Sequence, residues 1–221
     1  MKEFQCDLHI VGGALTGLLA AYSASSLDYK IIISEKKINT NNKKNPNHDT
    51  RTTAIAEGSK VFLEHQGLWK KIENFAEPIK NINVVDTAAS SKISFTNPKS
   101  KSNLGYIVKN SKLISVLTKE LRKKKNVKLI TGSNLSSIIY DKSEIISISN
   151  NTKINSKLIV AADGKKSAVR KILGTNVFKK KYNENALVIN FFHEKPHNNV
   201  AFEFFLKTGP LAILPMKKEN K

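Results

Sequence analysis

Apolar and polar positions along the first 35 residues follow the pattern of a strand, a helix and a second strand. Residues 6–11 form a short apolar run ended by glycine, which predicts a buried strand. Residues 15–25 place Leu, Ala and Tyr at helical spacing, and residues 30–34 contain three consecutive isoleucines, as in strands that are buried on both faces. Because crossovers between parallel strands are right-handed, this order predicts a βαβ unit whose two strands are neighbours.

The remaining periodicities predict a mixed α/β chain. Residues 36–47 are polar and rich in Asn and Lys, which indicates a solvated loop. Helices are predicted at 54–66, 68–75, 112–125 and 167–173, with Gly67 as the break between the first two. Strands are predicted at 81–86, 92–96, 127–131, 135–140, 144–149, 152–155, 158–162, 186–193, 200–206 and 211–214. The fold class is therefore α/β, with a Rossmann-like domain and an added, mainly antiparallel β portion.

Composition narrows the classes of function. The 221 residues carry a net charge of +19, but 34 of the 37 basic residues are lysine, which indicates compositional drift rather than a phosphate-gripping surface. Few aromatic residues lie among the basic ones, which argues against nucleic acid as the partner. The hydrophobic fraction of 40% is enough for a core. The single cysteine, Cys6, excludes an internal disulfide and a cysteine-based zinc site, and we predict no metal site.

The apolar stretch from Leu8 to Ala24 has the outline of a signal peptide. Glu3 and Asp7 leave its start nearly neutral, however, and a signal peptide has no need of the glycines placed within it. No other stretch approaches the roughly 20 apolar residues that span a bilayer. We therefore expect an intracellular chain without a transmembrane segment.

A glycine-rich turn joins the first predicted strand to its helix. A dinucleotide fingerprint has glycine at its first, third and sixth positions, and Gly12 and Gly17 match the first and the sixth. Ala14 replaces the glycine at the third position, whose small size lets the pyrophosphate approach, although Gly13 can ease the turn. Glu35 ends the second strand 18 residues after Gly17, where a carboxylate can accept the ribose hydroxyls of an adenosine. The alternatives are a packing turn and a surface glutamate. The complete order of elements favours a dinucleotide, and this unit alone leaves NAD and FAD open.

Three further segments carry a resemblance to a known family. Residues 48–55 resemble the D-x-R-x-x-A-[LI] segment of the flavin hydroxylases of ubiquinone biosynthesis. Residues 158–170 resemble the strand, Asp-Gly and helix motif of the wider p-hydroxybenzoate-hydroxylase-like monooxygenases. Residues 201–216 are similar to the substrate-domain segment of the 2-polyprenyl-6-methoxyphenol hydroxylase branch. The blocks occur in the order of the family.

The resemblance implies that FAD is the cofactor and assigns its contacts. The pyrophosphate would lie at the glycine turn and the adenosine ribose at Glu35. Arg51 would be a cation at the flavin end of the cleft, against the alternative of a surface charge in a polar loop. Asp163 and Gly164 would approach FAD, and Arg170 would help to fix their motif, against the alternative of an ordinary Asp-Gly turn. No residue is assigned as a catalytic acid or base.

The same resemblance implies an FAD-dependent monooxygenase that hydroxylates a polyprenylated phenol in ubiquinone biosynthesis. NAD(P)H would be the co-substrate and O₂ the oxygen donor, although the sequence shows no separate nicotinamide fingerprint. A lipid-soluble substrate implies a cytoplasmic protein working at the inner face of the cytoplasmic membrane. There it would be held peripherally or within a ubiquinone-biosynthesis complex.

The resemblance also implies a division into domains and a missing part. The FAD-binding domain would comprise residues 1–75 and 104–175, and a partial substrate domain would comprise residues 76–103 and 176–221. The family continues into a second flavin motif built around Gly-Asp, so we expect a C-terminally truncated form. One alternative is a non-catalytic FAD-binding fragment that needs the missing C-terminal half. Another is a basic nucleic-acid-binding protein, which the scarcity of arginine disfavours.

Overall fold

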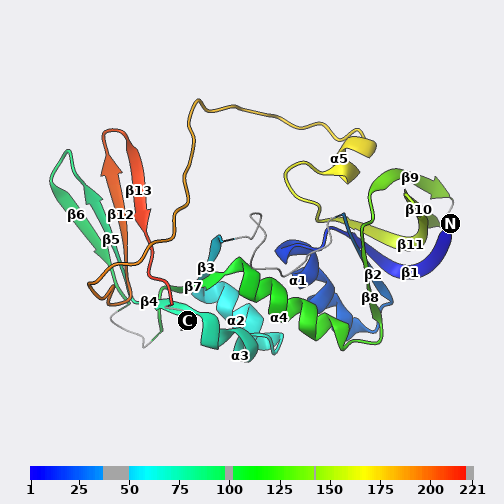
Figure 1. Ribbon diagram of the computed structural model, residues 1–221, viewed down its shortest axis with the longest axis horizontal. Coiled ribbons are helices and arrows are strands. Elements are labelled where there is room, and N and C mark those ends of the chain that lie inside the picture. The colour runs from blue at the N-terminus through cyan, green and yellow to red at the C-terminus, as the bar shows by residue number, and fades with distance from the viewer. Residues whose placement is uncertain (37–49, 98–101, 142, 218–221) are drawn as a thin grey trace. The chain divides into compact units, whose positions relative to one another are not determined.

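The computed structural model divides into two compact units (Figure 1). It describes residues 1–36, 50–97, 102–141 and 143–217. Unit 1 comprises Met1–His48 and Ile114–Ala186, and unit 2 comprises Asp49–Leu113 and Leu187–Lys221. The solvated loop predicted at 36–47 lies outside the described residues, apart from Lys36. The boundaries of these units differ from those of the predicted FAD-binding and substrate domains. The predicted domains were defined by the ligand that each would bind, so that division stays a prediction.

A six-stranded mixed sheet forms the centre of unit 1. Its strands are β1 (Lys2–Val11), β2 (Ile31–Glu35), β8 (Val127–Thr131), β9 (Leu135–Asp141), β10 (Glu144–Ser149) and β11 (Thr152–Ala161). The spatial order is β8-β2-β1-β11-β10-β9. The first four strands pair in parallel, and β10 and β9 continue the sheet by antiparallel pairing. The three isoleucines of β2 are buried, as expected for a parallel strand covered on both faces.

Four helical elements lie wholly or partly in unit 1, and α1 and α5 among them contact this sheet. They are α1 (Leu15–Ala24), the short 3₁₀ turn η1 (Ser25–Leu27), α4 (Asn110–Arg122) and α5 (Ala168–Ile172). Helix α1 contacts β1 and β2, and it buries Leu18 and Ala21. Helix α5 packs on β9, where Val169 joins Val11 and Leu135 in one apolar cluster. The division between the units falls inside α4.

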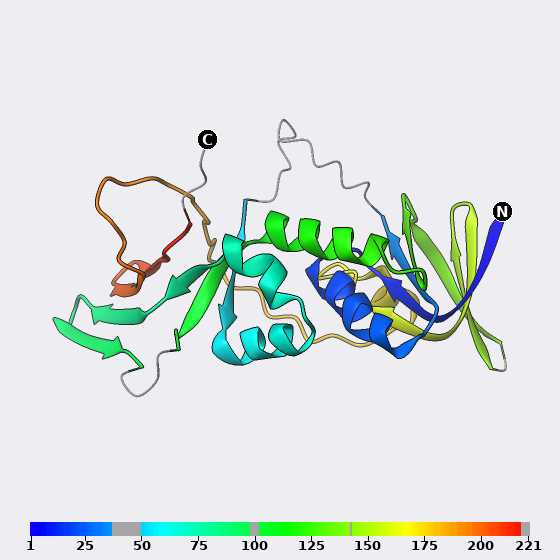
Figure 2. The same cartoon turned by 90° about the horizontal axis from the view of Figure 1, so that it is seen from below.

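Unit 2 contains two smaller sheets and two short helices (Figure 2). The three-stranded antiparallel sheet has the order β3-β7-β4, from β3 (Thr52–Ala56), β7 (Gly105–Lys109) and β4 (Glu77–Ile79). The four-stranded sheet has the order β13-β12-β5-β6, from β5 (Asn81–Asp86), β6 (Ser91–Phe95), β12 (Val200–Leu206) and β13 (Gly209–Ile213). Helix α2 (Glu57–His65) packs against β3 and β7, and α3 (Trp69–Ile72) with η2 (Glu73–Phe75) follows it. Gly67 separates the two helices as predicted, with a φ of +65°.

Four predicted elements differ from the structure. The helix predicted at 54–66 starts at Glu57, because residues 54–56 belong to β3 and pair with β7. The strands predicted at 152–155 and 158–162 form the single strand β11, because β1 pairs with almost its whole length. Residues 186–193, predicted as a strand, have no regular secondary structure. A β pattern becomes a strand only where a neighbour satisfies its backbone groups, and in the described part of the chain these residues have no such neighbour.

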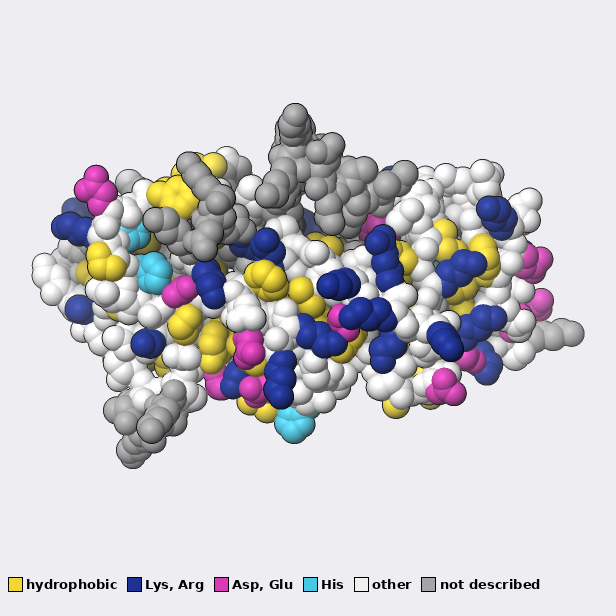
Figure 3. Space-filling model, turned by 60° about the horizontal axis from the view of Figure 1, so that its bottom comes forward, with side chains coloured by type: hydrophobic (Ala, Val, Ile, Leu, Met, Phe, Trp, Pro, Cys, Tyr) yellow, Lys and Arg dark blue, Asp and Glu magenta, His cyan; other side chains and the backbone are white. Residues whose placement is uncertain are grey.

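Many lysine side chains of this basic chain lie on the surface. On the face shown in Figure 3, Lys and Arg side chains are scattered among polar and apolar ones rather than gathered in a single patch. Across the residues with described coordinates, no helix is both long enough and apolar enough to cross a membrane.

Candidate functional site

Three strands of unit 1 end side by side at one edge of the sheet. Val11, near the end of β1, pairs with Ser34 of β2 on one side and with Ala161 of β11 on the other. Because all three strands are parallel, the residues that follow them meet at this carboxyl edge. Gly12 therefore lies between the end of β2 and the end of β11, which Asp163 follows, at the edge where ligands of open α/β sheets bind.

The glycine turn is set by close packing within unit 1. Gly12 has a φ of +112°, and its N–H donates to the carbonyl of Ser34 at 2.8 Å. A Cβ on Gly12 would overlap the carbonyl oxygen of Ala162, and a Cβ on Gly17 would overlap the carbonyl oxygen of Gly12. These two glycines therefore let β1, α1 and β11 approach one another. That is the packing role of glycine in a dinucleotide-binding turn.

Glu35 closes the turn from the end of β2. Its Oε2 accepts a hydrogen bond from the N–H of Gly13 at 2.6 Å, and its carbonyl accepts from the N–H of Ser133 at 3.0 Å. A Cβ on Gly13 would lie 3.0 Å from the Cβ of Glu35, so a side chain there would crowd the glutamate. The carboxylate predicted to contact a ribose is thus held against the glycine turn by a charge-assisted hydrogen bond.

The N-terminus of α1 faces this edge without a side-chain cap. Ala14 is the N-cap residue in an extended conformation, it is exposed, and it makes no side-chain hydrogen bond. No acidic residue lies in the first turn of the ten-residue helix. The first N–H groups of a helix lack partners within it, and the helix dipole adds partial positive charge there. This end can therefore bind an anion such as a phosphate.

Asp163 and Gly164 form the turn between β11 and α5. Oδ2 of Asp163 accepts hydrogen bonds from the N–H of Ala168 at 2.6 Å and of Val169 at 3.3 Å. Oδ1 of the same carboxylate is buried and has no hydrogen-bond partner among the described residues. Gly164 has a φ of +83°, and the position of its absent Cβ faces open space. The turn therefore holds one buried carboxylate oxygen and presents an accessible backbone at Gly164.

Two residues that follow this turn fix its conformation. Ser167 is the N-cap of α5, and its Oγ accepts from the N–H of Arg170 at 3.0 Å. The guanidinium of Arg170 donates through Nη2 to the carbonyl of Lys165 at 2.6 Å. The predicted part of Arg170 in the cofactor site, through fixing this motif, stays a prediction. The contribution of Ser167 escaped the sequence analysis, although a serine directly before a helix is a recognised capping signal.

Arg51 lies in unit 2, whereas the other predicted cofactor contacts lie in unit 1. It is exposed, directly precedes β3, and its carbonyl accepts from the N–H of Asn110 at 3.0 Å. His48 and Asp49 of the same motif lie outside the described residues. The structure thus brings the glycine turn, Glu35 and the Asp-Gly turn together. The meeting of Arg51 with them stays a prediction.

Two reactive side chains of β1 are buried. His9 is fully buried, with Nδ1 3.0 Å from Oγ of Ser147 and Nε2 2.9 Å from Oγ of Ser34. Burial lowers the pKa of His9 to about 4, so its ring is neutral at neutral pH. Burial also raises the pKa of the Cys6 thiol to about 11, which keeps it protonated. Neither residue offers a nucleophile or an acid to a bound substrate.

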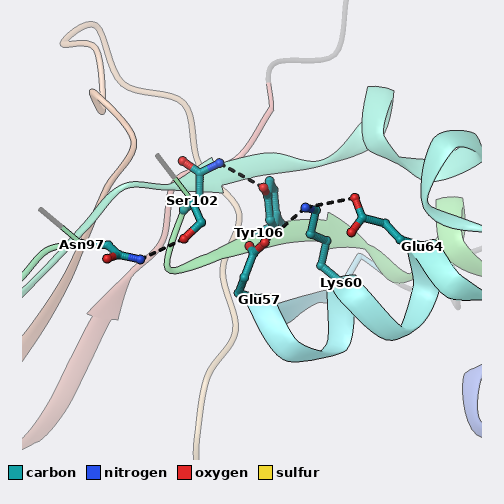
Figure 4. A network of polar contacts seen from close by, with 7 residues as sticks. Glu57, Lys60, Glu64, Asn97, Ser102 and Tyr106 are labelled. Atoms are coloured by element: carbon teal, nitrogen blue, oxygen red, sulfur yellow. Dashed lines mark hydrogen bonds and ion pairs between the residues drawn. The ribbon is translucent and has the colours of Figure 1, made fainter. Parts of the chain in front are cut away.

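Unit 2 has its own polar cluster, shown in Figure 4. Lys60 lies between two carboxylates of α2, with Nζ 3.1 Å from Oε1 of Glu57 and 3.0 Å from Oε1 of Glu64. The hydrogen bond with Glu64 is the main cause of the raised pKa of Lys60. Tyr106 packs edge-on against the buried Trp69, with ring centroids 4.7 Å apart. The tryptophan is thus a packing anchor, and the two ion pairs lie along α2 itself. Within the described ranges, no group of His, Cys, Asp and Glu side chains could hold a metal ion.

The fold and this edge together define a class of protein. A strand, glycine turn, helix and strand ending in an acid, joined by an Asp-Gly turn at the same edge, make a dinucleotide-binding fold. A family profile described as "FAD binding domain" matches residues 5–221. The chain belongs to this FAD-binding domain family. Of the two dinucleotides that the sequence left open, NAD and FAD, the family selects FAD.

Curated relatives are ubiquinone hydroxylases. The chain is 28% identical over 211 residues to the ubiquinone hydroxylase UbiL of Rhodospirillum rubrum, covering 95% of this chain and 49% of the relative. It is 31% identical over 228 residues to the mitochondrial ubiquinone biosynthesis monooxygenase COQ6 of Danio rerio, covering 95% of this chain and 47% of the relative. The predicted resemblance to the flavin hydroxylases of ubiquinone biosynthesis is confirmed. The chain spans about half the length of these relatives.

Solved structures confirm the predicted fold class. PqsL, a probable FAD-dependent monooxygenase from Pseudomonas aeruginosa, matches with a TM-score of 0.68 at 15% identity, covering 80% of this chain and 48% of that one. A geranylgeranyl bacteriochlorophyll reductase-like protein from Thermoplasma acidophilum matches with a TM-score of 0.70 at 17% identity, covering 97% of this chain and 54% of that one. At these identities the likeness concerns the fold.

Proposed function

We propose that this chain supplies the FAD-binding part of a monooxygenase that hydroxylates a polyprenylated phenol in ubiquinone biosynthesis, with NAD(P)H and O₂. The observation that carries the proposal is the meeting of Gly12, Glu35 and Asp163 at the carboxyl edge of one parallel sheet. The FAD-binding family and the ubiquinone hydroxylases among the curated relatives support the same reaction class.

The residues at this edge fit the parts of FAD. The uncapped N-terminus of α1, which begins at Ala14, would hold the pyrophosphate through its N–H groups. Glu35 is a carboxylate at the end of β2, and the Gly13 N–H orients it toward the adenosine ribose hydroxyls. Asp163 and the open backbone of Gly164 would contact the cofactor further along.

Arg51 and Arg170 would have different tasks. Arg51 would place a cation beside the flavin, where a planar guanidinium can bind an anionic oxygen in two places. Arg170 does not contact the cofactor in this proposal. It fixes the Asp-Gly turn through its hydrogen bond to the Lys165 carbonyl.

Bound FAD would supply the redox chemistry. One atom of O₂ would become the new hydroxyl of the phenol ring, the other would leave as water, and NAD(P)H would provide the two electrons. The chain's own residues bind the cofactor, orient it and keep the edge of the sheet rigid. We assign no catalytic acid or base, because His9 and Cys6 are buried. A polyprenylated substrate would bring the protein to the inner face of the cytoplasmic membrane, peripherally or in a biosynthetic complex.

A second candidate function is FAD binding without turnover. The observation that favours it is the match to about half the length of the curated relatives. In this case the chain would bind FAD and hydroxylate nothing until the rest of the enzyme is supplied.

The test begins with cofactor binding and then measures turnover. FAD is titrated into the purified chain while flavin fluorescence is followed, and NADPH-dependent incorporation of labelled O₂ into a polyprenylated phenol is then measured by mass spectrometry. Arg51→Ala is expected to weaken FAD binding about tenfold, whereas Arg122→Ala, at the end of α4, leaves it unchanged. Binding without turnover would select the second candidate. Absence of saturable FAD binding in the folded chain would refute both.

A further inference from the structure

A buried histidine joins two strands that are not neighbours in the sheet of unit 1. His9 of β1 has Nδ1 3.0 Å from Oγ of Ser147 in β10, and Nε2 2.9 Å from Oγ of Ser34 in β2. In the order of the sheet, β1 and β11 lie between β2 and β10. A neutral imidazole has one donor and one acceptor nitrogen, so the ring donates to one serine and accepts from the other. The ring therefore links β10 to the next-to-last residue of β2.

A second set of buried contacts starts two residues further along β10. Oγ of Ser133, which lies between β8 and β9, donates to Oγ of Ser149 at 2.9 Å. The N–H of Ser133 donates to the carbonyl of Glu35 at 3.0 Å. Both sets of contacts thus start on β10 and end on the last two residues of β2. We call the five side chains that make them, those of His9, Ser34, Ser133, Ser147 and Ser149, the β10 network.

The β10 network ends where the glycine turn is fixed. The carbonyl of Ser34 accepts from the N–H of Gly12 at 2.8 Å, and Oε2 of Glu35 accepts from the N–H of Gly13 at 2.6 Å. A displacement at the end of β2 would therefore change both contacts with the turn. In this way β10 is coupled by hydrogen bonds to the carboxylate that we assign to the ribose.

The side chains of the β10 network are buried in the core. Four of them expose 3% or less of their surface, and Ser133 exposes 9%. Burying a hydroxyl or an imidazole costs free energy unless it is hydrogen-bonded. Apolar side chains could fill the same space without that requirement. A satisfied polar network instead makes a core rigid and specifies one arrangement of its strands, so the gain lies in the position of the strands.

We propose that His9, Ser133, Ser147 and Ser149 are positioning residues for Glu35. Acting through the end of β2, they hold its carboxylate in the orientation in which it would bind the adenosine ribose. None of the four is assigned a contact with the cofactor. This inference rests on the proposed FAD site and adds the residues that set the geometry of its ribose end.

Hydrogen exchange of the full chain without cofactor tests the positioning directly. The N–H of Gly13 reports on the Glu35 carboxylate, because that carboxylate is its acceptor. Ser147→Ala and Ser149→Ala each remove one hydroxyl from β10 and leave the turn itself unaltered. We expect each to speed the exchange of the Gly13 amide about fivefold, measured by nuclear magnetic resonance.

Ser156→Ala is the matched control for the loss of a buried hydroxyl. Ser156 lies in β11 of the same sheet, exposes 1% of its surface, and donates through Oγ to the carbonyl of Ile145 at 3.4 Å. It is not part of the β10 network, so Gly13 exchange and FAD affinity should match those of the parent chain. A fall in melting temperature shared by all three alanine variants would reflect lost core hydrogen bonds rather than positioning.

FAD titration provides a second readout through a double-mutant cycle. Ser147→Ala and Ser149→Ala should each weaken FAD binding about threefold in the parent chain. In the Glu35→Gln chain the same changes should have no further effect, because substitutions that act through one group are not additive.

Two outcomes would overturn the proposal. The first is Gly13 exchange in both serine variants equal to that of the parent chain. The second is a loss of FAD affinity that is equally large with and without Glu35→Gln, since the serines would then act through another group. A parent chain that does not bind FAD would refute the proposed function instead, while Gly13 exchange would still decide whether the β10 network orients Glu35.

Discussion

The carboxylate of Glu35 accepts a hydrogen bond from the N–H of Gly13 at 2.6 Å, across 22 positions of sequence. The contact joins the end of β2 to the glycine turn after β1. It therefore couples the shape of the turn to the orientation of the acid that we assign to the cofactor ribose.

Replacing Glu35 with Gln tests this coupling. Glutamine keeps an acceptor for Gly13 but removes the charge, so we expect a loss of about 1 kcal/mol in the free energy of unfolding and about tenfold weaker FAD binding. Urea denaturation and flavin fluorescence measure the two effects. The control is Glu184→Gln, an exposed glutamate of the same unit. Equal FAD affinity in both variants would remove Glu35 from the proposed site.

Gly12→Ala tests the packing of the turn. The new Cβ would overlap the Ala162 carbonyl in a backbone of positive φ, so we expect a loss of about 3 kcal/mol or more in the free energy of unfolding. Gly58→Ala is the matched control, because its Cβ would meet nothing within 4 Å. Since Gly58 is inside α2, alanine there should stabilise the chain by about 0.5–1 kcal/mol. Similar melting temperatures for the two variants would contradict this account.

Asp163→Ala separates the capping role of the aspartate from its proposed cofactor role. Removing Oδ2 leaves the N–H groups of Ala168 and Val169 without their acceptor, which should cost about 1 kcal/mol and speed amide exchange in α5. The variant should also bind FAD more weakly. Asp86→Ala removes a similar acceptor, from Ala88 and Ala89 in unit 2, and should leave FAD affinity unchanged. If Asp163→Ala changed exchange in α5 but not FAD affinity, the aspartate would be a cap alone.

The buried His9 should make stability depend on pH. Its pKa is lowered by burial to about 4 from an ordinary value near 6.5, so the unfolded chain binds a proton at pH values where the folded chain does not. The stability that the neutral His9 contributes is fully present above pH 6.5 and is lost as the pH falls toward about 4. Between pH 7 and pH 5 we expect the free energy of unfolding to fall by about 2 kcal/mol.

Urea denaturation at the two pH values measures this loss. His9→Gln, which can still bond to Ser34 and Ser147, should be less stable at pH 7 but nearly insensitive over the same interval. An unchanged pH dependence in this variant would assign the effect to another group.

The local pattern determined the βαβ unit, the amphipathic face of α4 and the place of Gly67. These follow from hydrophobic spacing and glycine conformation within short stretches. The sequence also pointed to Gly12, Gly17, Glu35 and Asp163, because strand ends and glycines in order are local signals. Family resemblance, rather than spacing, selected FAD.

Tertiary structure decided what depends on partners distant along the chain. Residues 54–56 are a strand because β7 pairs with them, and β11 is continuous because β1 runs beside it. Residues 186–193 have strand-forming side chains but no partner in the described part of the chain, so they form no strand. Spacing also could not reveal that Asp163 caps α5 or that Glu35 binds Gly13. Those contacts arise when three parallel strands end at one edge, and strand pairing is a non-local interaction that short stretches of sequence do not encode.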